Sequence, residues 1–210
     1  MAADDRIRWD EIYKRAAAKP FPAPDPFLFE YTPPVPPDGS HFALDLAAGL
    51  GQNGLWLAEQ GYTVDIMDIS RVALTRAREE QAARGLRNVN LIPVDLDNLE
   101  LEQYRYDLVC VFRYLKRDAL PVIRSAVKPG GRLIYETFNL NYITKVPGFN
   151  VKFLLQPDEL AENFPGWELI VDRGGDVFDR ERLLAEHLDR LELGSQRREG
   201  RRGIASGQVH

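Results

Sequence analysis

The 210-residue sequence has few of the residues that build metal centres and covalent cross-links: one cysteine, two methionines and three histidines. Cys110 alone cannot form an internal disulfide, and no Cys/His spacing typical of zinc sites is present. No apolar run approaches the roughly 20 residues that span a bilayer, and the first residues lack the pattern of a secretory signal. We therefore expect a cytoplasmic protein that does not bind membranes.

The sequence also has fewer basic than acidic residues, with 27 Lys and Arg against 32 Asp and Glu, so its net charge is −5. Nucleic-acid binding needs a basic face to neutralise phosphates, so this balance argues against such a partner. Hydrophobic residues make up 44% and charged residues 28%, which excludes a disordered or fibrous chain. The length suits one domain with short appendages, and we expect a monomer or a homodimer.

Residues 1–40 contain an amphipathic pattern over 5–18 and a proline-rich strap over 20–37. Because proline fixes φ and lacks a donor, we expect the strap to contain neither helix nor central strand. It is expected to lie over the domain, a loose linker being the alternative. Its expected apolar anchors are Phe21, Phe27, Leu28, Phe29 and Tyr31.

Residues 41–172 alternate short apolar runs with helical patterns, which predicts an α/β fold with a doubly wound, mostly parallel sheet. The runs are hydrophobic almost throughout, as is typical of strands that are covered on both faces. The expected strands are 42–47, 63–68, 89–94, 106–112, 132–138 and 167–172. The expected helices are 53–60, 70–84, 117–127 and 157–163.

A glycine-rich turn joins the first expected strand to the first expected helix of this region. Gly49, Gly51 and Gly54 have the spacing of a dinucleotide-binding turn, in which glycines let the backbone approach a ligand. Helix N–H groups just beyond would present positive partial charge to that ligand. A glycine match by itself is weak, and a purely structural turn is the alternative.

Three acids, Asp45, Asp68 and Asp95, stand at the ends of three successive expected strands. Open α/β folds bind ligands at this edge of the sheet. Asp45 would repel a pyrophosphate but suits a cationic amine, and Asp68 could accept from both ribose hydroxyls. Asp95 could accept from an adenine amine, and the N–H of Leu96 could donate to a ring nitrogen. The implied ligand carries an adenosine and a positive charge without phosphate, unless these are merely solvated surface acids.

The sequence resembles class I S-adenosylmethionine-dependent methyltransferases over about residues 7–172, and more closely the tellurite-resistance-type small-molecule methyltransferases. The closer resemblance rests on the proline strap and on ordered motifs: Trp9-Asp-Glu-Ile-Tyr13, Asp45-Leu-Ala-Ala-Gly49-Leu-Gly51-Gln-Asn53, Phe112-Arg-Tyr-Leu-Lys116, Lys128-Pro-Gly-Gly131, Tyr135-Glu-Thr-Phe138 and Phe153-Leu-Leu-Gln-Pro-Asp-Glu-Leu160. The resemblance implies a Rossmann-like methyltransferase fold with a seven-stranded sheet and S-adenosylmethionine as methyl donor. It also implies a substrate that enters under the N-terminal helix.

The C-terminal region, 173–210, departs from this family pattern. The family ends in an antiparallel hairpin of its sixth and seventh strands, whereas here Gly174 and Gly175 are followed by a helix-like pattern over 184–193. We therefore expect the seventh strand to be missing, which would leave a sheet edge uncovered. The polar tail over 195–210 is expected to be disordered.

The implied reaction is methyl transfer to a small molecule, such as a thiol or a chalcogen oxyanion, by in-line displacement. Since the donor is already activated, alignment and exclusion of water suffice, and no catalytic residue is assigned. The cofactor-binding residues that the resemblance implies are Asp45, Ala47, Gly49, Gly51, Asn53, Asp68, Ile69, Asp95, Leu96 and Phe112. The candidates for the substrate face are Trp9, Tyr13, Arg113, Tyr114, Tyr142 and Lys145.

Other interpretations stay open. Trp9 and Tyr13 could simply anchor the N-terminal helix, and Arg113 could be a solvated loop charge. A non-catalytic module could keep the fold and the cofactor while acting through a partner. A nicotinamide oxidoreductase fits the glycine spacing, but Asp45 opposes its pyrophosphate and the Tyr-x-x-x-Lys pair of short-chain enzymes is absent. A nucleic-acid methyltransferase is disfavoured by the acidity and by the lack of an Asn/Asp-Pro-Pro-Tyr motif.

Overall fold

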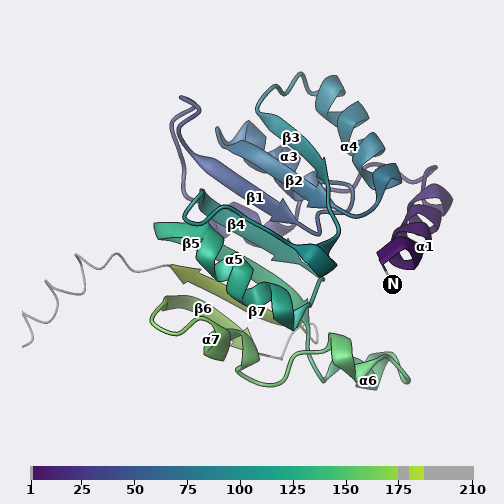
Figure 1. The fold of residues 1–210 in the computed structure, drawn as a ribbon, viewed down its shortest axis with the longest axis vertical. Helices are drawn as coiled ribbons and strands as arrows, with labels where there is room; N and C mark the ends of the chain where they lie inside the picture. The colour runs from purple at the N-terminus through teal and green to yellow at the C-terminus, as the bar shows by residue number, and fades with distance from the viewer. Residues whose placement is uncertain (1, 175–179, 187–210) are drawn as a thin grey trace, which may run out of the picture.

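The computed structural model describes residues 2–174 and 180–186, which form a twisted sheet with helices on both faces (Figure 1). The strands are β1 (Phe42–Leu46), β2 (Thr63–Asp68), β3 (Val89–Pro93), β4 (Tyr106–Phe112), β5 (Val127–Phe138), β6 (Glu168–Gly174) and β7 (Arg180–Glu186). The α-helices are α1 (Ala2–Arg15), α2 (Pro26–Tyr31), α3 (Gln52–Glu59), α4 (Arg71–Ala83), α5 (Leu120–Ala126), α6 (Tyr142–Lys145) and α7 (Glu159–Asn163). Short 3-10 helices are η1 (Leu96–Asn98), η2 (Arg117–Ala119) and η3 (Val151–Phe153).

The seven strands pair in the order β3-β2-β1-β4-β5-β7-β6. The pairings from β3 to β5 are parallel, and β7 pairs antiparallel with both β5 and β6. Because the chain starts at the centre with β1 and winds out in both directions, the doubly wound, mostly parallel sheet expected from the sequence is confirmed. The carboxyl ends of β1 to β4 therefore meet at one edge of the sheet.

The expectation that the seventh strand is missing was wrong. β7 spans Arg180–Glu186 and pairs with β5 over seven residues, from Arg132 with Glu186 to Phe138 with Arg180. The segment is rich in Leu, Arg, Glu and Ala, which have high helix propensity, but pairing with β5 and β6 overrides that local preference. The part of the expected helix beyond Glu186, and the tail expected to be disordered, lie outside the described residues.

Alternate residues of the central strands pack into two separate cores. On one face, Leu44 and Val109 pack with Ile123 of α5. On the other face, Leu108 packs with Leu55 of α3 and with residues of α2 and α4. Both faces of the central strands are therefore apolar, which explains the nearly continuous hydrophobic runs in the sequence.

The proline-rich strap contains a helix, which corrects the expectation that prolines exclude one. Pro26 occupies the first turn of α2, where the missing N–H is tolerated, and Asp25 caps the helix. The expected anchors Phe27 and Leu28 are buried. Phe29 does not anchor the strap in the core, because it is 54% exposed; its ring lies against that of Trp56, with centroids 5.0 Å apart.

Replacing Asp25 by Ala should lower the free energy of unfolding by about 1 kcal/mol, because α2 loses its N-cap. In the native chain Oδ1 of Asp25 accepts from the N–H of Phe27 at 3.0 Å. Urea denaturation measures the change. Asp25→Ser is the matched control, since serine also caps helices, and it should retain most of the lost stability; an equal loss in both variants would contradict a capping role.

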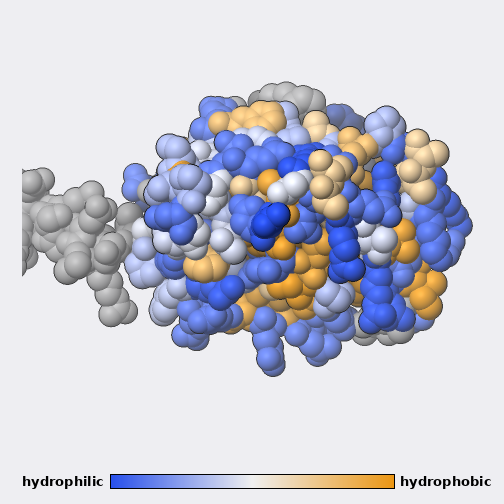
Figure 2. All heavy atoms as spheres, turned by 90° about the horizontal axis from the view of Figure 1, so that it is seen from above, coloured by the Kyte–Doolittle hydropathy of each residue, from blue (hydrophilic) through white to orange (hydrophobic). Residues whose placement is uncertain are grey.

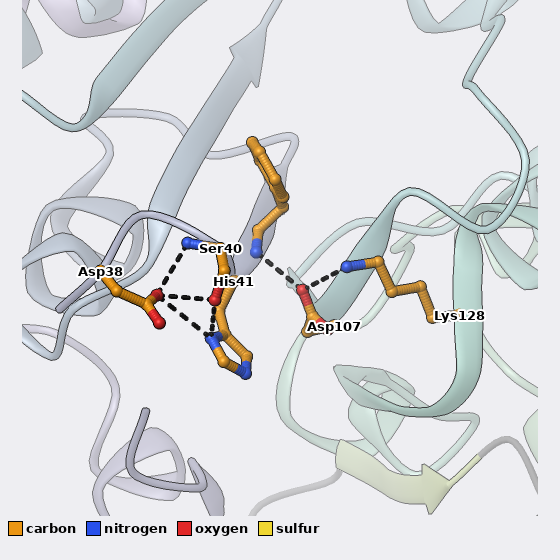
Figure 3. Close-up of polar contacts among 6 residues, drawn as sticks. Asp38, Ser40, His41, Asp107 and Lys128 are labelled. Carbon is orange, nitrogen blue, oxygen red and sulfur yellow. Dashed lines mark hydrogen bonds and ion pairs between the residues drawn. The ribbon is translucent and has the colours of Figure 1, made fainter. Parts of the chain in front are cut away.

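The amino ends of the central strands are held together by Asp107 (Figure 3). Its Oδ2 accepts from the N–H of Phe42 and from Nζ of Lys128, both at 2.8 Å. In the loop before β1, Asp38 accepts from Ser40, whose hydroxyl is 3.0 Å from Nδ1 of His41. These contacts set where β1, β4 and β5 begin, at the end of the sheet opposite the three acids.

The surface mixes polar and apolar groups. On the face in Figure 2, hydrophilic residues surround smaller areas of hydrophobic surface. Several exposed apolar side chains belong to α1, where Ile7, Trp9 and Ile12 are 57%, 39% and 43% exposed. Within the described ranges, no helix has the length and apolar character that crossing a membrane requires.

Candidate functional site

The turn between β1 and α3 is built from residues in the left-handed backbone region. Ala47, Gly49 and Gly51 have φ angles of 54°, 58° and 74°. Glycine adopts this region freely, whereas it is uncommon for a residue with a Cβ such as Ala47. The N–H of Ala48 donates to the carbonyl of Met67, and the N–H of Gly51 to that of Ala48, both at 3.0 Å. The sharp turn expected from the glycine spacing is therefore present.

Two glycines allow close approach at different places. A Cβ on Gly49 would lie 2.5 Å from the hydroxyl oxygen of Tyr13 in α1. A Cβ on Gly54 would lie 2.5 Å from Cγ1 of Ile66, which is fully buried in β2. Gly54 thus lets α3 pack on the sheet, whereas Gly49 keeps the space above the turn open to a side chain or a ligand.

Asp68 ends β2 and is only 7% exposed. Its Oδ2 accepts from the N–H of Gly49 at 2.7 Å, and its Oδ1 accepts from the N–H of Ser70 at 2.8 Å. Burial raises the pKa of this carboxyl, and the two backbone donors oppose the rise because they favour the charged form. The acid after the second strand therefore contacts the glycine turn directly.

Asp45 lies beneath the turn rather than at its surface, with 1% of the residue exposed. Its Oδ2 accepts from the N–H of Gly54 at 2.8 Å, and its Oδ1 lies 3.6 Å from Sγ of Cys110. Burial raises the pKa of Asp45 to about 7, against the lowering effect of those two donors. This carboxyl holds the start of α3 against β1.

Asp95 follows β3 and caps η1, where its Oδ1 accepts from the N–H of Asp97 at 3.0 Å. The charges of both Asp95 and Asp68 act on Tyr114, which follows β4. Burial raises the pKa of the Tyr114 phenol, and Asp97, Asp95 and Asp68 are among the carboxylates whose charges raise it further. Asp68 and Asp95 lie on the same edge of the sheet because they end or follow the adjacent parallel strands β2 and β3, and Tyr114 follows β4 at that edge.

The remaining expected cofactor residues have different environments. Ile69 follows β2 and is partly buried, while Leu96 and Phe112 are 7% and 8% exposed and each packs in a core. Asn53 is committed elsewhere, because it is 3% exposed and its Oδ1 accepts from the N–H of Asp25 at 2.8 Å. Asn53 thus ties α3 to the strap.

Helix α1 lies beside the carboxyl ends of the strands and against α4 (Figure 1). Oδ1 of Asp10 accepts from Oγ of Ser70 at 2.7 Å and from the N–H of Val72 at 3.2 Å. Arg76 of α4 donates to the carbonyl of Ala16 at 3.2 Å, just after α1. The role of Asp10 is not evident from the sequence, because its partners lie about 60 residues away along the chain.

Trp9 and Tyr13 stack on each other, with ring centroids 6.1 Å apart. The hydroxyl of Tyr13 reaches the position over Gly49, whereas Trp9 is 39% exposed at the outer side of α1. Both residues expected on the substrate face therefore belong to the helix that covers the turn, and Tyr13 is the one that contacts it.

The expected substrate residues Tyr142 and Lys145 lie in α6, in the segment 139–155. Tyr142 packs between the rings of Phe138 and Phe149, with centroids 4.2 and 5.1 Å away, and Lys145 is exposed. The cluster forms a separate aromatic group that extends from the end of β5.

Arg117 fixes the end of this segment to η2. Its guanidinium donates to the carbonyls of Lys152 and Leu154 at 2.7 and 3.0 Å and pairs with Glu159, with Nη2 and Oε2 2.8 Å apart. Sequence reasoning quoted Glu159 as part of a motif without seeing its partner. The pairing gives that motif a structural role.

Two comparisons of the sequence with known proteins match methyltransferases. Residues 43–131 match the family model described as a methyltransferase domain. Mouse (Mus musculus) glycine N-methyltransferase is 29% identical over 140 residues, which cover 55% of this chain and 47% of that protein. The chain therefore spans about half the length of this curated relative.

Solved structures share the fold at low sequence identity. A structure from work on the conversion of a disulfide bond into a thioacetal group during echinomycin biosynthesis has a TM-score of 0.63 at 19% identity, covering 92% of this chain and 98% of the other. A TehB-like SAM-dependent methyltransferase from Corynebacterium glutamicum has a TM-score of 0.58 at 17% identity, covering 89% and 97%. At these identities the likeness concerns the fold.

Proposed function

We propose that the chain is a class I S-adenosylmethionine-dependent methyltransferase and that it transfers a methyl group from S-adenosylmethionine to a small molecule. The observation that carries the proposal is the contact between Asp68 and the glycine turn. A buried carboxylate at the end of β2 accepts from the N–H of Gly49, so an acid and a close-approach turn lie side by side. A ligand with ribose hydroxyls next to a compact, phosphate-free group fits that pair.

The residues present fit an adenosine-containing cofactor. In this proposal Asp68 accepts from the ribose hydroxyls, and Asp95 with the N–H of Leu96 binds the adenine at the next strand end. Gly49 and Gly51 have no Cβ, so in this proposal the cofactor can approach the backbone of the turn closely. The acidity of this edge suits a ligand that brings positive charge, and it disfavours the pyrophosphate of a nicotinamide dinucleotide.

Two expected contacts change in this proposal. Asn53 already accepts from the strap and is buried, so we assign it to holding the strap rather than to the cofactor. Asp45 is buried beneath the turn and bonded to Gly54, so it acts on the cofactor amine through charge and by fixing the turn. The direct contacts of the cofactor are then made by Asp68, Asp95 and the turn backbone.

The protein's part in the reaction is alignment and exclusion of water. A bound S-adenosylmethionine would supply an activated methyl group for in-line displacement by the acceptor. Helix α1 covers the turn and its Tyr13 closes the space over Gly49, which keeps solvent from the reacting centre. Among the described residues we assign no general base to this step.

The acceptor is proposed to be a thiol or a chalcogen oxyanion, as in the tellurite-resistance-type subgroup that the motifs resemble. The motif Trp9-Asp-Glu-Ile-Tyr13 supports this choice, since it lies in α1, whose Tyr13 covers the glycine turn. Arg113 and Tyr114, directly after β4 at the same edge of the sheet, are the other residues proposed to meet the acceptor.

Calorimetric titration of the full chain with S-adenosylhomocysteine and, in parallel, with NAD tests the cofactor. Transfer of a labelled methyl group from S-adenosylmethionine to thiols and to selenite or tellurite tests the reaction. Binding of S-adenosylhomocysteine with turnover supports the proposal. Binding without turnover on any acceptor favours a non-catalytic module, and preferential binding of NAD contradicts the cofactor assignment.

A further inference from the structure

The residue directly after β4, Arg113, has an unusual backbone conformation. Its φ is 57°, in the left-handed region, and its N–H donates to the carbonyl of Glu136 in β5 at 2.7 Å. The hydrogen bond to the neighbouring strand holds the residue in this conformation, which costs energy for a side chain larger than glycine. The strand therefore stops here with a fixed turn, and the guanidinium leaves the sheet at its carboxyl edge.

A buried carboxylate from the strap lies beside this guanidinium. Nη2 of Arg113 is 3.7 Å from Oδ2 of Asp25, and the two side chains are 49% and 6% exposed. Asp25 is immobilised, because its N–H donates to Asn53 and its Oδ1 accepts from Phe27. The strap thus supplies a fixed negative charge that keeps Arg113 at the mouth of the site.

The pairing leaves donors of Arg113 unused. A separation of 3.7 Å exceeds hydrogen-bond length, and within residues 2–174 the structure shows no hydrogen bond from the guanidinium to another group. Guanidinium carries five N–H donors in a planar fork that matches carboxylates and other oxyanions. About half of the side chain is open to solvent, so such an anion can reach it.

The guanidinium also lies on the side of the glycine turn. Burial raises the pKa of the Tyr13 phenol, the charge of Asp68 raises it further, and the charge of Arg113 lowers it. Asp68 and Arg113 therefore both act on the hydroxyl of Tyr13, which lies over Gly49. Arg113 brings positive charge to the place where the methyl group would be transferred.

We propose that Arg113 binds a negatively charged group of the methyl acceptor, and that Asp25 holds the guanidinium in place for it. The inference rests on the proposed function and narrows its substrate class to anions. Asp45, Asp68 and Asp25 supply carboxyl groups at this edge, so an anionic acceptor needs a cation to enter. Arg113 meets that need without contacting the acids that serve the ribose and adenine.

The test uses two thiols that differ only in a carboxylate, thiosalicylate and thiophenol, titrated into the full chain loaded with S-adenosylhomocysteine. The native protein should bind thiosalicylate about ten-fold more tightly than thiophenol, the effect of a charge-assisted hydrogen-bonded pair. Arg113→Met should abolish this preference, while Arg113→Lys should keep part of it. Arg78→Met, at an exposed position on α4, is the matched control and should leave the preference unchanged.

A rival source of the anion is the cofactor's own carboxylate, and the same variants distinguish it. If Arg113→Met weakens S-adenosylhomocysteine but not methylthioadenosine, which lacks the amino-acid part, the residue serves the cofactor and the inference is overturned. Equal binding of the two thiols by the native loaded protein overturns it as well. Failure of the native chain to bind S-adenosylhomocysteine instead overturns the proposed function, and this inference with it.

Discussion

Replacing Asp68 by Ala is expected to weaken binding of S-adenosylhomocysteine by about 10- to 100-fold. The substitution removes hydrogen bonds between a charged acceptor and ligand hydroxyls, which are worth roughly 1.5–3 kcal/mol. The effect is large because the carboxylate is 7% exposed, so no water replaces the lost acceptor at little cost. Isothermal titration of the variant and the native chain under identical conditions measures the change.

The same carboxylate also accepts from the N–H groups of Gly49 and Ser70, so the alanine variant could lose affinity through a distorted turn. Asp68→Asn is the milder substitution. Asparagine keeps an acceptor oxygen for only one of the two N–H groups and has no charge, so affinity should fall between the native and alanine values. Glu79→Ala removes a negative charge from the exposed side of α4 and should leave affinity unchanged. Native affinity in a folded Asp68→Ala protein would refute the role of Asp68.

The sequence predicted the parallel part of the sheet well because its signals are local. Strands β1 to β4 are short apolar runs that end in turns, and parallel pairing follows from the helices between them. The juxtaposition of Asp68 with Gly49 also follows from this topology, since adjacent parallel strands end at the same edge. The topology could not predict how deeply each acid is buried relative to the glycine turn. Asp45 lies beneath the turn, whereas Asp68 lies beside it.

The errors arose where distant partners or specific caps override local preference. Residues 180–186 have the composition of a helix but pair as a strand, because the open edges of β5 and β6 supply a full ladder of hydrogen bonds. In the strap, Asp25 and Pro26 together start a helix, although the density of prolines suggested none. The bond from the strap to Asn53 joins residues 28 positions apart, and no local pattern reveals it.

Asp45→Asn is expected to change the pH dependence of stability strongly, because the pKa of the buried carboxyl is far from its ordinary value. The carboxyl has an ordinary pKa of 3.8 and a folded pKa of about 7, so between about pH 4 and 7 it is protonated in the folded chain and ionised in the unfolded chain. Unfolding then releases a proton, and the free energy of unfolding falls as pH rises through this window. The largest slope from one such group is about 1.4 kcal/mol per pH unit.

Asparagine does not titrate, and its side-chain oxygen can still accept from the N–H of Gly54, which donates to Asp45 in the native chain. The free energy of unfolding of Asp45→Asn, minus that of the native chain, should therefore grow from about pH 4 to pH 7 and level off above it. Chemical denaturation at several pH values across this range measures the difference.

If the free energies of unfolding of the two proteins change with pH in the same way, Asp45 has an ordinary pKa in the folded chain and the expectation is contradicted. Cys110→Ala serves as a second variant, because it removes the thiol near Oδ1 while leaving the carboxyl in place. A pH dependence that persists in Cys110→Ala and disappears in Asp45→Asn assigns the proton to the carboxyl. Such a result also explains how an acid can lie under the turn: burial keeps a substantial share of it uncharged near neutral pH, and a cationic ligand would favour its ionised form.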